Sequence, residues 1–254
     1  MDTFLYLRTL ELKNTISSTI KNRIDALKEG YVFSYMEFDN ASKNKEAIIK
    51  CLGRLVDAGK LHKLSKGKYY KPIKGDHNSI GPDANEIIKD LLVKNGQPIG
   101  YVTGFNVFNK AIIETPISNT IQIGRNTFKP TLYRRMYTIE FILQRNEITN
   151  DNIEILQVLD CIKMINSIPE NNRDKTLTNI GKVIRRYNKQ QRGLLIQCSL
   201  KYNSATRALL GIILDTEKIK KGIDDIMESL NPISTYNIKI KKIEKALKDK
   251  WNIR

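Results

Sequence analysis

The sequence predicts an α+β fold with two domains, over residues 1–75 and 76–254. Two observations predict it. Before residue 71, segments with helical apolar spacing alternate with short β-type runs, and a stretch rich in proline and glycine follows over residues 71–82. The chain has 254 residues, 41% of them hydrophobic, which is enough for two globular cores.

The first domain is predicted to contain three helices and a hairpin. In chain order these are a helix over 17–29 ended by Gly30, a strand over 31–33, a short helix over 34–38, a turn over 39–42, a helix over 43–58 and a hairpin over 60–71. Ser42 is expected to cap the longer helix and Gly59 to end it. This order is that of a winged helix-turn-helix.

The second domain is predicted to combine α and β elements, with several helices. A helix over 83–95 comes first, followed by tight turns around a short helix over 96–106. Strands are expected over 120–124, 131–137 and 138–143. The last region is predicted to be helical, with helices capped by Asn150 or Asp151 and by Ser204, another over 174–188, and a lysine-rich helix from Ile238.

The charge predicts a polyanionic partner. The net charge is +16, and residues 1–75 hold 15 basic and 8 acidic side chains. Residues 76–145 hold 8 and 6, and residues 146–254 hold 20 and 13. Nucleic acid, an anionic membrane surface and a phosphate-rich ligand all fit such an excess. Membrane binding is the least favoured, because the basic C-terminal segment lacks a strongly apolar face.

The predicted longer helix and hairpin hold the candidate DNA-binding residues. A helix with a buried apolar stripe and a basic outer face fits the major groove, and a basic hairpin fits the adjacent backbone. Duplex DNA is favoured over RNA because no aromatic stacking platform is visible. A solvated basic surface is the alternative. The candidate residues are Lys43, Asn44, Lys45, Lys50 and Arg54 on the helix, and Lys63, Lys66 and Lys68 on the hairpin.

A possible second basic face lies in the C-terminal region. Its residues are Arg185, Arg186, Lys189 and Arg192. This face either follows a phosphate backbone or is solvated helix surface.

Other sites and locations are not indicated. Cys51, Cys161 and Cys198 lie far apart among apolar residues, so we expect three reduced core thiols and no metal site. The glycines of 96–106 lack the lysine and hydroxyl of a phosphate loop, and no cofactor is expected. No apolar run approaches a membrane span and the first residues do not resemble a secretory signal, so a cytoplasmic location is expected.

Four stretches resemble the AbiEi antitoxin family, the transcription-regulating antitoxins of type IV toxin–antitoxin systems. They are residues 48–61 with 66–70, residues 101–106 with Thr115-Pro116 and Gly124-Arg125-Asn126, residues 156–165, and residues 200–211. The resemblance implies an N-terminal winged helix that binds inverted repeats in operator DNA upstream of its own operon and represses it. It also implies a C-terminal domain that counters a nucleotidyltransferase toxin without a stable complex.

Three other hypotheses remain open from the sequence. The first is a winged-helix regulator whose C-terminal domain senses a ligand, and the second is a non-catalytic RNA-binding protein. The third, an enzyme, is the least favoured. A nucleotidyltransferase needs a Gly-Ser turn and spaced carboxylates for its metal ions, whereas the nearest acidic pair, Asp224 and Asp225, is adjacent.

Overall fold

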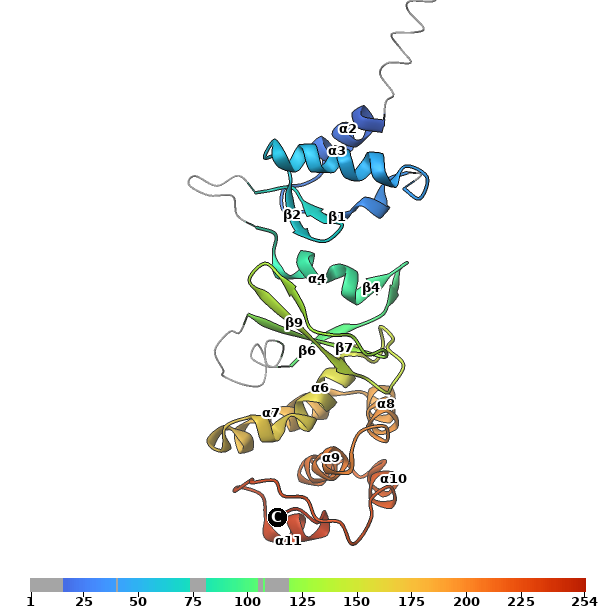
Figure 1. Ribbon diagram of the computed structural model, residues 1–254. Coiled ribbons are helices and arrows are strands. Elements are labelled where there is room, and N and C mark those ends of the chain that lie inside the picture. Colours follow the sequence, from blue (N-terminus) through green and yellow to red (C-terminus); the bar gives the residue numbers. More distant parts are fainter. Residues whose placement is uncertain (1–15, 40, 74–80, 105–106, 108–118) are drawn as a thin grey trace, which may run out of the picture. The chain divides into compact units, whose positions relative to one another are not determined.

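The fold is mixed α+β, as predicted (Figure 1). The computed structural model describes residues 16–39, 41–73, 81–104, 107 and 119–254. The chain divides into two compact parts, unit 1 (Met1–Asp90) and unit 2 (Leu91–Arg254). Most of the predicted linker, residues 74–80, lies outside the described residues.

Unit 1 combines two helices with a three-stranded antiparallel sheet. Its elements are α2 (Ile16–Ala26), β1 (Val32–Ser34), the 3-10 helix η1 (Tyr35–Glu37), α3 (Lys45–Asp57), β2 (His62–Ser65) and β3 (Lys68–Tyr70), in that order. The strand order is β1-β3-β2, with Phe33 opposite Tyr69 and His62 opposite Tyr70. The predicted element order in this region is therefore confirmed, although the short helix is 3-10.

Different interactions stabilise the C-terminal ends of α2 and α3. The Lys71 Nζ donates to the carbonyl oxygens of Asp25 and Leu27 at the end of α2, 2.7 and 2.8 Å away. Gly59 follows α3 with a φ of +70°, and two backbone hydrogen bonds close the helix end there, as predicted. The prediction that Ser42 caps α3 is wrong. Asn44 occupies the N-cap, and its side chain makes no capping hydrogen bond.

Unit 1 ends within α4 (Ala84–Leu92), and unit 2 then begins with a short hairpin that local sequence explains. The helix predicted over 83–95 is α4, and β4 (Val93–Lys94) and β5 (Gln97–Pro98) follow it. Asn95 and Gly96, with φ of 51° and 75°, form the turn. Asn-Gly suits the left-handed pair that a two-residue hairpin needs, so β-pairing replaces the predicted last turn of helix.

A four-stranded sheet forms the β layer of unit 2. It contains β6 (Tyr101–Thr103), β7 (Thr120–Arg125), β8 (Leu132–Arg134) and β9 (Tyr137–Leu143) in the order β6-β7-β9-β8. β7 and β9 are parallel, and the other pairs are antiparallel. The three strands predicted from residues 120 to 143 are thus confirmed. The prediction of tight turns around a short helix over residues 96–106 is wrong for residues 97–103, because β5 and β6 lie there and β6 pairs with β7.

Helices follow the sheet and gather on one side of it (Figure 1). They are α6 (Ile153–Lys163), η2 (Ile165–Ser167), α7 (Glu170–Arg186), α8 (Lys189–Ser199), α9 (Ser204–Thr216), α10 (Ile223–Glu228) and α11 (Lys245–Lys250). The capping predictions are wrong by one or two residues, because Asn152 precedes α6 and Asn203 caps α9. α8 was not predicted.

The lysine-rich helix predicted from Ile238 begins only at Lys245, as α11, so its predicted start is wrong. The chain is not helical over residues 237–244, Ile238 and Ile240 are both buried, and Tyr236 pairs with Ile253 in a parallel bridge. Backbone hydrogen bonds join Tyr236 to Asn252 and Arg254. Ile238 and Ile240 are two residues apart and both pack in the core of unit 2. This packing outweighs the helical spacing that the sequence also contains in this region.

Candidate nucleic-acid interface

α3 carries a buried face and a basic face. Ile48, Leu52 and Leu55 are buried in the core of unit 1, where Cys51 joins them. The helical period then directs Lys45, Lys50 and Arg54 to solvent, and all three are exposed. Lys50 and Arg54 lie on neighbouring parts of the exposed side of α3, whereas Lys45, nine residues before Arg54, lies on the opposite side of the helix.

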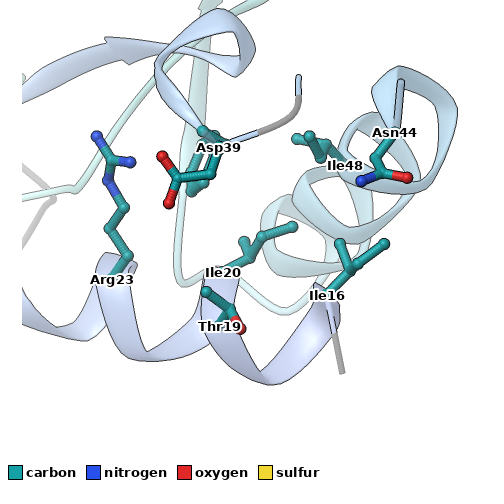
Figure 2. Close-up of a pocket in the computed structure, with 8 residues that line it drawn as sticks. Ile16, Thr19, Ile20, Arg23, Asp39, Asn44 and Ile48 are labelled. Atoms are coloured by element: carbon teal, nitrogen blue, oxygen red, sulfur yellow. The ribbon is translucent and has the colours of Figure 1, made fainter. Parts of the chain in front are cut away.

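The other two predicted residues lie at the start of α3. Lys43 is exposed in the turn before the helix. Asn44 instead lines a pocket of about 180 Å³ between α2 and α3. Figure 2 shows Ile16, Ile20 and Ile48 around this pocket, with Asn44 at one end and Arg23 beside Asp39 at the other. The Asn44 side chain is therefore not on the same surface as the exposed cations.

The hairpin tip is held against η1. Gly67 has a φ of +74°, and a Cβ there would lie 3.1 Å from the Tyr35 ring. The Tyr35 N–H donates to the Gly67 oxygen at 3.4 Å, and the Lys45 Nζ lies 5.9 Å from the centre of the Tyr35 ring. Tyr35 therefore contacts both the hairpin and α3, which fixes their relative position within unit 1.

The hairpin lysines differ in their surroundings. Lys63 and Lys66 are exposed. Lys68 is half-buried, and its Nζ lies 2.9 Å from the Asp90 carboxylate. Lys63 and Lys66 are free to meet a phosphate, whereas Lys68 would have to leave its ion pair first.

The predicted second basic face is partly occupied by intramolecular contacts. The Arg185 guanidinium pairs with Glu217, and Arg192 donates to the Arg185 carbonyl at 2.8 Å. Arg186 and Lys189 are exposed at the junction of α7 and α8. The four residues thus lie near one another at this junction. Among the described residues, Arg185 and Arg192 already make intramolecular contacts, which leaves Arg186 and Lys189 to meet a ligand.

A buried polar cluster in unit 2 was missed by the sequence predictions. The Asp160 carboxylate accepts hydrogen bonds from the hydroxyls of Tyr101 (2.7 Å), Thr103 (2.8 Å) and Tyr202 (2.8 Å). Gln144 donates to both tyrosine hydroxyls, at 2.8 and 2.9 Å. A carboxylate inside the apolar run of residues 155–165 was the available signal, because a buried charge needs partners.

Burial sets the titration of this cluster. Desolvation, and to a lesser degree the neighbouring Asp160, raises the pKa of Tyr101 and Tyr202 well above the usual range. Desolvation also raises the pKa of Asp160, against the opposing effect of the three hydroxyl donors. Both phenols therefore remain hydrogen-bond donors at neutral pH. The groups saturate one another, which is typical of a structural network.

The three cysteines are free and buried, as predicted. Within the described residues, no group of three or more His, Cys, Asp or Glu side chains is arranged to hold a metal ion. Asp224 and Asp225 lie exposed in the first turn of α10. His77 lies outside the described residues.

Cys161 is expected to react slowly in the folded chain. Burial, and then the neighbouring Asp160, raises the pKa of the Cys161 thiol to about 12 from a usual value of 9.0. Because the thiolate is the nucleophile, we expect its alkylation by iodoacetamide at pH 8 to be on the order of 1000-fold slower than in the chain unfolded in urea. Timed peptide mapping by mass spectrometry measures both rates, and equal rates would contradict the burial of this thiol.

Comparisons with protein-family models and with curated proteins gave no match to this chain. In the part of the chain that the structure describes, no helix combines the length and apolarity that crossing a bilayer requires.

Proposed function

We propose that this protein is a DNA-binding transcriptional regulator and that unit 1 is a winged helix-turn-helix. In this proposal α3 enters the major groove and the β2–β3 hairpin lies against the adjacent backbone. The observation that carries it is the pair of exposed cations Lys50 and Arg54 on the side of α3 away from its buried apolar residues. The contact of Tyr35 with both α3 and the hairpin supports a single preformed surface.

The resemblance to the AbiEi family extends this proposal. We propose that the protein is the antitoxin and autorepressor of a type IV toxin–antitoxin operon and binds inverted repeats upstream of it. Its functional partner is a nucleotidyltransferase toxin encoded beside it, which it counters without a stable complex. The proposal places the protein in the cytoplasm and requires no cofactor.

The double variant Lys50→Ala/Arg54→Ala tests the role of α3. We expect it to lower the affinity for duplex DNA from upstream of its own gene by at least about 30-fold, because each of the two lost contacts costs about 1–3 kcal/mol. Fluorescence anisotropy at fixed salt measures the affinity. The matched control is Lys21→Ala/Lys28→Ala, which removes two exposed charges of unit 1 outside α3.

The outcomes separate the hypotheses. Equal losses in both double variants would show that only the total charge matters and would refute the α3 proposal. Tighter binding of the unaltered chain to structured RNA than to the operator duplex would favour the RNA-binding hypothesis instead.

The hairpin lysines are expected to act through phosphates. In the double variant Lys63→Ala/Lys66→Ala, the slope of log affinity against log salt should fall by about 2, because each phosphate contact contributes about 0.9. Lys68→Ala should change the slope less, because Lys68 is already paired with Asp90. Binding measured from 50 to 300 mM salt gives the slopes, and an unchanged slope in the double variant contradicts the role of the hairpin.

The antitoxin function has a separate test. The full chain should restore the growth of cells that express the nucleotidyltransferase encoded beside it. The Lys50→Ala/Arg54→Ala variant should lose repression of the operon but still restore growth, since unit 2 is unchanged. If the unaltered chain represses the operon but does not restore growth, the protein is a regulator and not an antitoxin.

A further inference from the structure

Unit 2 contains a cavity of about 270 Å³ that is lined by cations from three segments. Arg145 follows β9, Lys163 is the last residue of α6, and Lys201 lies between α8 and α9. Leu143, Gln144, Tyr202 and Asn203 complete the lining, which contains no carboxylate. Three like charges that converge on one cavity repel one another, and a bound anion would relieve this repulsion.

These cations form no ion pair among the described residues, although the charge of Lys163 opposes the rise in the pKa of the buried Asp160. Arg145, Lys163 and Lys201 are exposed and belong to none of the ion pairs formed within the described part of the chain. The nearest buried acid, Asp160, lies behind Tyr202 and accepts hydrogen bonds from three hydroxyls. It is therefore saturated by neutral donors and does not occupy the cavity.

The backbone on both sides of two of these cations is fixed by hydrogen bonds. Gln144 and Asn146, which flank Arg145, are both buried, and the Asn146 amide group donates to the Cys198 carbonyl at 3.1 Å. The Arg207 guanidinium donates to the carbonyls of Leu200 and Tyr202, which flank Lys201, at 3.1 and 3.2 Å. The backbone that carries these two cations is thus fixed before a ligand binds, and only the exposed side chains have to be ordered on binding.

A helix start adds to the positive potential. Asn203 lines the cavity and caps α9, a helix of 13 residues, by accepting from the Thr206 N–H at 2.9 Å. The positive end of the helix dipole therefore lies at the cavity. The floor residues Gln144 and Tyr202 use their polar groups internally, so recognition falls to the three cations and the Asn203 amide group.

We propose that this cavity binds the phosphate group of a small phosphorylated ligand of about the size of a nucleoside monophosphate. A half-open site of this volume suits a small molecule better than a nucleic-acid backbone, which needs a continuous basic track. Guanidinium and ammonium donors on three sides match the oxygens of a phosphate. The site lies in unit 2 and is independent of the proposed DNA-binding face of unit 1.

The test uses the full chain and three probes, inorganic phosphate, adenosine 5′-monophosphate and adenosine. We expect saturable binding of both phosphate probes by titration calorimetry and none of adenosine. The amide resonances of Arg145, Lys201 and Asn203 should shift on binding. The variant Arg145→Ala/Lys201→Ala should bind the phosphate probes at least about tenfold more weakly, the loss expected for charge-assisted hydrogen bonds. Arg145→Lys should retain part of the affinity.

The matched control is Lys182→Ala/Lys220→Ala, which removes two exposed cations of unit 2 outside the cavity lining. It should bind the phosphate probes like the unaltered chain. The proposal is overturned if neither phosphate probe binds, or if both double variants lose affinity equally. It is also overturned if only duplex DNA affinity falls in Arg145→Ala/Lys201→Ala, since the cations would then follow a nucleic-acid backbone.

Discussion

Replacement of Trp251 by alanine is expected to lower the free energy of unfolding of unit 2 by about 3–5 kcal/mol. Trp251 is 1% exposed, and its indole N–H donates to the Asp215 carboxylate on α9 at 2.8 Å. The ring also packs on Gly211, where a Cβ would lie 2.3 Å from ring carbons. Loss of the ring removes a large buried apolar surface and leaves a cavity between the C-terminal segment and α9.

Urea denaturation followed by circular dichroism measures this effect. Tryptophan fluorescence cannot be used for the comparison, because Trp251 is the only tryptophan in the sequence. The control is Trp251→Phe, which keeps an aromatic ring but loses the hydrogen bond, and should cost less. A loss below about 1 kcal/mol in Trp251→Ala would show that the C-terminal segment does not stabilise unit 2.

Gly211 supplies an independent test of the same contact. Gly211→Ala should destabilise the unaltered chain, because the new methyl group and the indole ring require the same space. In the Trp251→Ala background the same substitution should be neutral or stabilising, since alanine favours a helix interior by about 1 kcal/mol over glycine. Additive effects in this double-mutant cycle would contradict the packing of Trp251 on α9.

Replacement of Asp160 by alanine is the substitution with the second largest expected effect. It leaves the hydroxyls of Tyr101, Thr103 and Tyr202 without their shared acceptor inside the core of unit 2. An unsatisfied buried donor costs about 1–3 kcal/mol, and relief of the buried charge offsets part of the total, so we expect a net loss of about 2–4 kcal/mol. Urea denaturation measures it, and a stability equal to that of the unaltered chain would contradict the role of the network.

The same residue predicts a pH dependence. Burial raises the pKa of Asp160 above its ordinary value of 3.8, so the folded chain holds this proton at a pH where the unfolded chain has lost it. The contribution of Asp160 to stability must then fall as the pH rises from about 4 through the folded pKa. Asp160→Asn removes this contribution, and the difference in stability between the two chains, measured from pH 4 to 8, should follow this trend. A constant difference would contradict the direction of the shift.

Local sequence patterns were sufficient for most of unit 1. The helical spacing of Ile48, Leu52 and Leu55 identified the buried stripe of α3, and Gly59 and Gly67 marked a helix end and a hairpin turn. The exposed positions of Lys50 and Arg54 follow from the same spacing. The positions of Asn44, in the pocket beside α2, and Lys68, paired with Asp90, did not follow from it.

Local patterns were insufficient where one segment suits two structures. Residues 238–251 contain apolar residues at both strand and helix spacing. Only their packing in the core of unit 2 decides that a non-helical segment comes first and that the short α11 follows it. At the starts of α3, α6 and α9, neighbouring polar residues competed for the N-cap, and the observed choice differs from each prediction by one or two residues.

By itself, the sequence determined the α+β class, the order of elements over residues 16–70, three strands of unit 2 and the outward positions of Lys50 and Arg54 on α3. These features depend on periodicity and turn chemistry within a few residues. Only the tertiary structure decided the hydrogen-bond partners of Asp160, which lie 42 to 59 residues away along the chain. The same holds for the packing of Trp251 on Gly211 and for the cavity lined by Arg145, Lys163 and Lys201. Such contacts arise from the packing of distant elements, and local residue spacing does not encode them.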